Sequence, residues 1–212
     1  MAKSRGMGIG LLICAAAALL IVQADAQTQA QGSPAGPPQL KQVGYVKASN
    51  TESPDHFGCG GALDGHTGNS VAISADGSTM AIGAHQEASN AKGINGNQAN
   101  NSAYAAGAVY VYTRTPSGGW AQQAYVKASN PGPGANFGAS VSLSADGNTM
   151  VVGSHFESSA SKGVNSNQND ESIPQAGAAY VFSRSGTTWT QQAYLKASNT
   201  GRVSDGSEDD FG

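Results

Sequence analysis

Short runs in which polar and apolar residues alternate recur along this chain, and polar turns separate them. The run Ser140–Ser144 (SVSLS) places Val141 and Leu143 on one face, and TMVVGSH follows at Thr149–His155. Alternation with a period of two is typical of a strand with one buried face. The Ala-Asp-Gly-Asn between the two runs favours a tight turn, because Asp and Gly tolerate positive φ. The pattern predicts an antiparallel hairpin.

Every segment of this pattern occurs twice. Beyond each hairpin lies an Asn-rich loop of about twenty residues, which is long for a loop, and two further strands are predicted after it. Aromatic residues at fixed repeat positions are expected to pack within and between the repeats. The matched strand segments are Ser70–Ser74 and Ser140–Ser144, Thr79–His85 and Thr149–His155, Ala106–Arg114 and Ala176–Arg184, and the segments that begin at Trp120 and Trp189.

The hexapeptide YVKASN marks the spacing of the repeat. It occupies Tyr45–Asn50 and Tyr125–Asn130, and it returns as YLKASN at Tyr194–Asn199, so the intervals are 80 and 69 residues. The first interval is longer because it carries an insertion at Cys59–Gly68 (CGGALDGHTG). Each hexapeptide is predicted to end an outer strand and to lead to the Phe-Gly that opens the next repeat.

Four short antiparallel strands in one repeat cannot bury both faces of their own sheet, so each unit needs stacked neighbours. Such units in tandem build β-propellers. The expected fold class is all-β, with two complete four-stranded propeller-type blades at 41–124 and 125–193 and the start of a third at 194–212. Propellers close with four to eight blades. The chain is therefore interpreted as a fragment, with an open stack or a ring of several copies as alternatives.

Three groups of residues resemble the FG-GAP repeats that build the β-propeller of integrin α chains and occur in exported bacterial proteins. They are Phe137–Val141 (FGASV), Ser144–Gly147 (SADG) and Val152–Ser154 (VGS), with counterparts in the first copy. The resemblance implies a propeller fold for most of the chain from Tyr45 onward. It implies little about function, because propellers carry adhesion, lectin-like binding and enzymatic activity alike.

The turn between the first two strands differs from the calcium-binding loops of integrin-type repeats. Those loops have the form D-x-D-x-D-G, whereas here one carboxylate stands in each turn, at Asp76 and Asp146. Calcium prefers six to eight oxygen ligands, several of them carboxylates. Calcium at Asp76 or Asp146 therefore stays a weak possibility, and no cofactor is expected.

The N-terminus has the pattern of a secretory signal peptide at residues 1–26. Lys3 and Arg5 precede the apolar run Ile9–Val22, which is short for a membrane span, and Ala24–Ala26 forms an A-x-A cleavage site. An uncleaved anchor, or a lipid on Cys14, is the alternative. Residues 27–40, with three prolines, are predicted to be a disordered linker. Cleavage after Ala26 would place the protein outside the cell or in its envelope.

The composition and charge of the chain exclude one class of function. Charged residues make up 12% of the chain and the formal net charge is -3. Nucleic-acid binding is excluded, because no basic patch is present to neutralise phosphates. After cleavage Cys59 would be the remaining cysteine, and it would be free or paired outside this sequence.

Two clusters invite a chemical interpretation. His85 and His155 stand at equivalent positions after the second strand of each repeat, and paired imidazoles can bind a transition metal. Local hydrogen bonding by each histidine is the preferred interpretation. The second cluster combines a thiol, a carboxylate and an imidazole, which are the groups of a nucleophilic catalytic site: Cys59, Asp64 and His66. These residues lie in a Gly-rich loop without a scaffold to orient them. No catalytic residue is assigned.

The Asn-rich loops are the remaining candidate for a binding site. Their amides could bind sugar hydroxyls, peptide edges or a weakly held cation, although turn formation explains the same composition and is preferred. The equivalent candidates are Asn95, Asn97 and Gln98 in the first copy and Asn165, Asn167 and Gln168 in the second.

The predicted function is a non-enzymatic binding or adhesion module outside the cell or at its surface. Its ligand would be a protein or a glycan, and its remaining blades would come from missing sequence or from other copies. One alternative is the propeller part of a larger secreted enzyme whose catalytic part lies elsewhere. Another is a structural β-solenoid.

Overall fold

The computed structural model describes residues 41–59, 68–201 and 211. The predicted signal peptide at 1–26 and linker at 27–40 therefore lie outside the described residues. So do Asp64 and His66 of the insertion.

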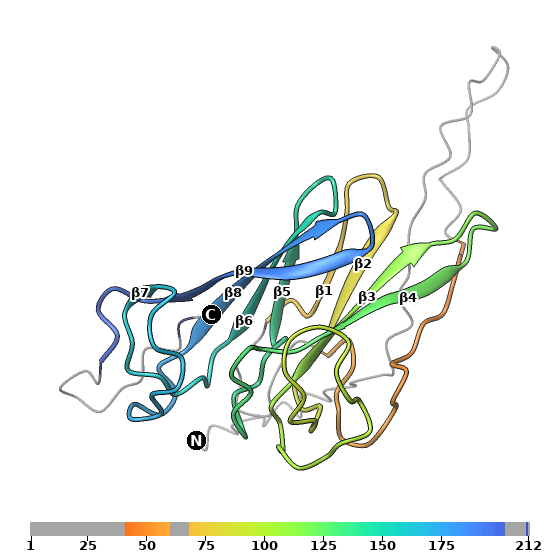
Figure 1. Cartoon of the computed structure of the whole chain (residues 1–212). Coiled ribbons are helices and arrows are strands. Elements are labelled where there is room, and N and C mark those ends of the chain that lie inside the picture. The colour runs from red at the N-terminus through yellow and green to blue at the C-terminus, as the bar shows by residue number, and fades with distance from the viewer. Residues whose placement is uncertain (1–40, 60–67, 202–210, 212) are drawn as a thin grey trace, which may run out of the picture.

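Two antiparallel sheets form the described part of the chain, which contains no helix (Figure 1). The first sheet has the strand order β1-β2-β3-β4. Its strands are β1 (Val71–Ile73), β2 (Thr79–Ala84), β3 (Ala108–Arg114) and β4 (Trp120–Val126). Each strand pairs with the next one along the chain, so the four strands predicted for the first repeat are confirmed.

The second sheet repeats this order and adds one strand. Its order is β5-β6-β8-β9-β7. Its strands are β5 (Ser140–Leu143), β6 (Thr149–Ser154), β7 (Gly163–Val164), β8 (Ala178–Ser185) and β9 (Thr188–Lys196). The short β7 comes from the long loop, was not predicted, and pairs with the outer strand β9. The first sheet has only an isolated bridge, Ile94 to Val126, at this place.

The two sheets stack because each has an aromatic face and a small aliphatic face. Along β3, Val109 and Val111 point to the second sheet, whereas Tyr110 and Tyr112 point the other way. From the second sheet, Tyr180 and Phe182 pack on the small face of the first. The alternation of side chains along a strand places these residues on opposite faces. The sequence pattern therefore encodes a stack of sheets and not an isolated one.

The hairpins of the two sheets lie side by side at the centre of the molecule (Figure 1). The Ala75 N–H of the β1–β2 turn donates to the Ala145 carbonyl of the β5–β6 turn at 2.9 Å. The Val141 N–H donates to the Asn69 carbonyl at 2.7 Å. The first hairpins of the two sheets are thus joined by backbone hydrogen bonds.

The Phe-Gly that opens one repeat packs against the Ala-Gly-Ala of the repeat before it, which stands at residues 106–108 and 176–178. Gly107, with φ +82°, forms a parallel bridge with Phe137, and a Cβ on Gly107 would lie 2.0 Å from the Phe137 carbonyl oxygen. Gly177 stands in the same relation to Phe211, again at 2.0 Å. Glycine is required at both places because no side chain fits. Phe137 is fully buried, whereas Phe211 is 36% exposed.

The first hexapeptide departs from the prediction. Tyr45–Asn50 forms no strand, although it was predicted to end an outer strand like its two counterparts. In the other two repeats, three inner strands precede the hexapeptide and form the sheet that it joins. The described residues include no such strands before Tyr45. Tyr45 is consequently 54% exposed, whereas Tyr125 and Tyr194 are fully buried.

Candidate functional site

A buried ion pair lies at the end of the first sheet, where the long loop of residues 85–107 begins. Lys127 Nζ lies 2.8 Å from Glu87 Oε2, and the two side chains are 0% and 1% exposed. The Ser89 N–H donates to the same oxygen at 3.1 Å. Burial lowers the pKa of Lys127, and Glu87 opposes that shift. A buried pair is tolerated only when its remaining hydrogen-bonding groups are satisfied.

The preceding hexapeptide supplies the remaining partner. Asn50 donates through Nδ2 to Glu87 Oε1 at 3.1 Å. Its other side-chain atom, Oδ1, accepts a short hydrogen bond from the hydroxyl of Tyr110. The asparagine of one hexapeptide and the lysine of the next therefore contact the same glutamate, each through a different carboxylate oxygen.

The second sheet reproduces this arrangement atom for atom. Lys196 Nζ lies 2.8 Å from Glu157 Oε2, and the side chains are 0% and 4% exposed. Asn130 Nδ2 donates to Glu157 Oε1 at 2.9 Å, and the Tyr180 hydroxyl donates to Asn130 Oδ1 at 2.7 Å. Tyr194 adds a hydroxyl hydrogen bond to Glu157 Oε1 at 3.0 Å. We call these two sites the Lys–Glu–Asn sites.

Asn95 and Asn165 hold the long loops to the outer strands. Each has positive φ, 56° and 52° respectively, a conformation that Asn tolerates better than most residues. The Asn95 Oδ1 accepts from the Tyr125 N–H at 2.9 Å, and the Asn165 Oδ1 accepts from the Tyr194 N–H at 2.9 Å. These two amides therefore pair with strand edges of their own chain.

The other amides predicted as ligand contacts also bond within the chain. Asn97 and Asn167 each accept, through Oδ1, from the N–H two residues later, at 3.0 and 3.1 Å. Gln98 accepts through Oε1 from the Ser49 hydroxyl, and Gln168 accepts from that of Ser129. These bonds show how the chain uses the six candidate amides in building the loops.

Other side chains of the same loops face solvent, and there the two copies differ. Asn101 and Tyr104 in the first loop correspond to Glu171 and Pro174 in the second, and all four are exposed. Several buried and hydrogen-bonded positions are identical, as at Glu87 and Glu157. Each loop thus joins a fixed base to a variable tip.

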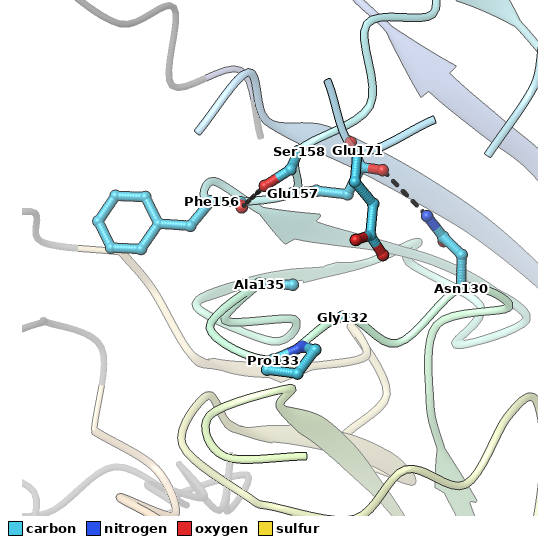
Figure 2. A pocket seen from close by; sticks show the side chains of 8 residues that line it. All are labelled: Asn130, Gly132, Pro133, Ala135, Phe156, Glu157, Ser158 and Glu171. Atoms are coloured by element: carbon cyan, nitrogen blue, oxygen red, sulfur yellow. Dashed lines mark hydrogen bonds between the residues drawn. The ribbon is translucent and has the colours of Figure 1, made fainter. Parts of the chain in front are cut away.

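A small cavity of about 120 Å³ opens beside the second Lys–Glu–Asn site. Figure 2 shows Glu171 projecting between Asn130 and Ala135, with the Asn130 amide turned toward Glu157. The residues that line the cavity come from the linker between the sheets and from the second long loop: Asn130, Gly132, Pro133, Ala135, Phe156, Glu157, Ser158 and Glu171. The cavity can take a polar group of a few atoms at the loop tip.

The carboxylates of Asp76 and Asp146 are used inside their turns. Asp76 Oδ1 accepts from the Ser74 hydroxyl at 2.6 Å and from the Ser78 N–H at 3.0 Å. These bonds lower the pKa of Asp76 to about 2. Asp146 makes the matching bonds to Ser144 and Asn148, and its pKa is lowered in the same way.

The structure places His85 and His155 in different surroundings. The His85 Nδ1 lies 3.1 Å from the carbonyl of Cys59, and its ring packs edge-on against His56 at 5.2 Å. His155 instead packs on Phe156 with the ring centroids 4.0 Å apart. Within the described ranges, no group of three or more His, Cys, Asp or Glu side chains is arranged to hold a metal ion. Cys59 is disulfide-bonded in the full chain.

One buried carboxylate has no counterpart in the second repeat. Asp55 is 7% exposed and stands where the second repeat has Ala135. Its Oδ2 accepts from the Glu52 N–H at 3.1 Å. Burial, followed by repulsion from Glu87 and Glu52, raises the pKa of Asp55 to about 6.

Sequence reasoning missed the Lys–Glu–Asn sites. The lysine and the asparagine belong to the hexapeptide, but Glu87 and Glu157 lie in the polar loops and look solvated in the sequence. The signal that could have found them is recurrence, since both glutamates stand two residues after the recurring histidine.

The sequence model of the FG-GAP repeat matches residues 120–182. This segment is similar to an FG-GAP repeat. It starts at β4 and ends within β8, so it joins the outer strand of the first sheet to β5, β6, β7 and part of β8 of the second. FG-GAP repeats are β-propeller-like, are generally non-catalytic binding modules and typically occur in extracellular proteins.

No curated protein and no solved structure matches the chain. Across the described residues, no helix is both long and apolar enough to cross a membrane.

Proposed function

We propose that this protein is a non-enzymatic binding module of the propeller type that acts outside the cell, with recognition at the tips of its two long loops. Its two sheets are then two complete blades, and Phe211 opens a third. A signal peptide cleaved after Ala26 would export it. The ligand is a protein or a glycan at a cell surface.

The observation that carries this proposal is the contrast between loop base and loop tip. The same Lys–Glu ion pair and Asn–Glu hydrogen bond hold the loop base in both copies. The exposed tips carry Asn101 and Tyr104 in one copy and Glu171 in the other. A rigid base with variable exposed residues is how loops on stable scaffolds commonly recognise partners. Tyr104, at 64% exposure, offers the aromatic surface that binding hot spots favour.

Calcium is not part of the proposal. The carboxylates of Asp76 and Asp146 already accept hydrogen bonds from their own turns. One carboxylate per turn supplies few of the oxygens that calcium needs.

The test is a binding screen of the exported protein on a printed array of glycans and extracellular proteins. A tip variant combines Asn101→Ala, Tyr104→Ser and Glu171→Ala. A matched control changes Ser117→Ala in the β3–β4 turn, which lies at the other end of the sheet. We expect unchanged circular dichroism in both variants and loss of array binding in the tip variant alone.

Two results would contradict the proposal. The first is a wild-type protein that binds nothing on the array. The second is equal loss of binding in the tip variant and in the Ser117 control.

A further inference from the structure

We propose that each Lys–Glu–Asn site forms a covalent isopeptide bond, Lys127 to Asn50 and Lys196 to Asn130. The inference is independent of the proposed function, because it concerns how successive hexapeptides are joined. It starts from three groups that are needed together: an amine, an amide carbon and a shared carboxyl group.

The amine is positioned and desolvated. Lys127 and Lys196 are each 0% exposed in their side chains, and each Nζ lies 2.8 Å from a glutamate oxygen. A buried lysine gives up its proton more readily than an exposed one, and burial lowers the pKa of Lys127. Neutral lysine amines are good nucleophiles in such surroundings.

The amide is activated from the other side. The Asn50 Oδ1 accepts from the Tyr110 hydroxyl, and the Asn130 Oδ1 accepts from the Tyr180 hydroxyl at 2.7 Å. A donor on this oxygen stabilises the negative charge that develops there when the adjacent carbon is attacked. The Asn Nδ2, which must leave, already donates to Glu Oε1 at 3.1 Å in the first site and 2.9 Å in the second.

The glutamate contacts both nitrogens and can carry protons between them. Glu87 Oε2 first takes a proton from Lys127 Nζ, and the nitrogen lone pair then attacks Cγ of Asn50. The Nζ–Cγ bond forms while the charge on Oδ1 is held by Tyr110. The Cγ–Nδ2 bond breaks after Glu87 Oε1 delivers a proton to Nδ2. The second proton of Nζ then passes through Glu87 to the released ammonia, which leaves as ammonium.

The reaction balances without an oxidant or a co-reactant. A lysine ammonium and an asparagine amide become a secondary amide and an ammonium ion, and the glutamate returns to its carboxylate form. Holding the groups in place supplies the main rate advantage, since both reactants belong to one folded chain.

Recurrence is the second support for the proposal. The lysine and the asparagine are both members of the hexapeptide, but each site takes its lysine from one copy and its asparagine from the copy before. The first copy is the instructive exception. Lys47 is exposed, because the described residues provide no preceding glutamate for it.

The decisive measurement is peptide mapping by mass spectrometry of the purified full chain. We expect each bond to lower the mass by about 17 Da, the mass of one ammonia. We also expect digestion to release branched peptides that join Lys127 to Asn50 and Lys196 to Asn130. Fragmentation of the branched peptides is required, because cyclisation of an N-terminal Gln27 or of an asparagine also releases ammonia.

Three variants sharpen the test. Lys127→Met should remove one branched peptide and leave the other, and Glu157→Gln should remove the bond at Lys196. Lys47→Met, the matched control, should change neither. Wild-type protein that yields only linear peptides covering Asn50, Lys127, Asn130 and Lys196 overturns the proposal.

Discussion

Trp189 of the second sheet donates its indole N–H to Gln123 Oε1 of the first sheet at 2.9 Å. Arg184 donates to the same oxygen at 3.2 Å. The equivalent indole of the first sheet, Trp120 Nε1, is buried and has no hydrogen-bond partner among the described residues. Arg114, the equivalent of Arg184, donates from Nη1 to the Gly118 carbonyl of its own sheet at 3.3 Å. Among the described residues, the tryptophan indole is thus hydrogen-bonded only where one sheet stacks on another.

This contrast predicts that the two tryptophans respond differently to the same substitution. Trp189→Phe removes a hydrogen bond across the sheets and should destabilise the protein by about 1–2 kcal/mol more than Trp120→Phe. The comparison is matched, because an arginine stacks on each ring, at 5.0 Å for Trp120 and 5.4 Å for Trp189. Urea denaturation of both variants measures the difference, and equal losses would refute the bond across the sheets.

The buried ion pair predicts a large effect of removing one partner. Glu157→Ala leaves the Lys196 ammonium buried without its counter-charge, which should cost about 3–5 kcal/mol of unfolding free energy. Loss of the proposed bond between Lys196 and Asn130 would add to this cost. Thermal and urea denaturation measure the loss. Glu171→Ala, an exposed carboxylate of the same loop, is the control and should change stability by less than about 0.5 kcal/mol. A comparable loss in both variants would show that burial of the pair is not the cause.

The stability of the protein should depend on both the backbone conformation and the side chain of Asn165. Asn165→Gly keeps the positive φ and loses the bond to the Tyr194 N–H, whereas Asn165→Ala loses the bond and strains the backbone. We expect a cost of about 1 kcal/mol for glycine and about 1–2 kcal/mol more for alanine. Hydrogen exchange adds a site-specific readout. The Tyr194 amide should exchange faster in both variants. In the control variant Asn167→Ala, its exchange rate should be unchanged.

Asp55 predicts a pH dependence of stability. Its pKa of about 6 in the folded protein exceeds its ordinary value of 3.8, so the folded state binds this proton more tightly. The stabilising contribution is complete below pH 3.8 and is lost as the pH rises through 6. A gap of roughly two pKa units corresponds to about 3 kcal/mol.

Asp55→Asn should therefore stabilise the protein at pH 7 and have little effect at pH 3.5. Thermal melting across this range is the measurement. Glu171→Gln serves as the control, with the wild-type pH profile retained. A variant that is equally stabilised at both pH values would show that charge burial is not responsible.

The strands and turns could be predicted from sequence because their causes are local. Alternation sets the faces of β5 and β6, and Asp-Gly sets the turn between them. The histidines could not be resolved in this way. His85 and His155 are equivalent in sequence, but their neighbours are not, since His56 packs against one and Phe156 against the other.

The Lys–Glu–Asn sites depend on contacts between residues 27 to 40 positions apart in the chain. Lys127 meets Glu87 across 40 residues, and Glu87 meets Asn50 across 37. No local pattern distinguishes a glutamate that will be buried from one that will be solvated. The first hexapeptide failed as a strand for a related reason, since identical sequence forms a strand only where partner strands exist.

The most direct test of the stacked sheets is a cross-link between their first hairpins. Ala75 and Ala145 share a backbone hydrogen bond of 2.9 Å, which brings their Cα atoms within the range of a disulfide, about 4.4–6.8 Å. The variant Ala75→Cys with Ala145→Cys should form an intramolecular disulfide under mild oxidation, identified by peptide mapping. Ala75→Cys with Asn101→Cys, at opposite ends of the first sheet, should not. Failure of the first pair to cross-link in a folded monomer would contradict the stack.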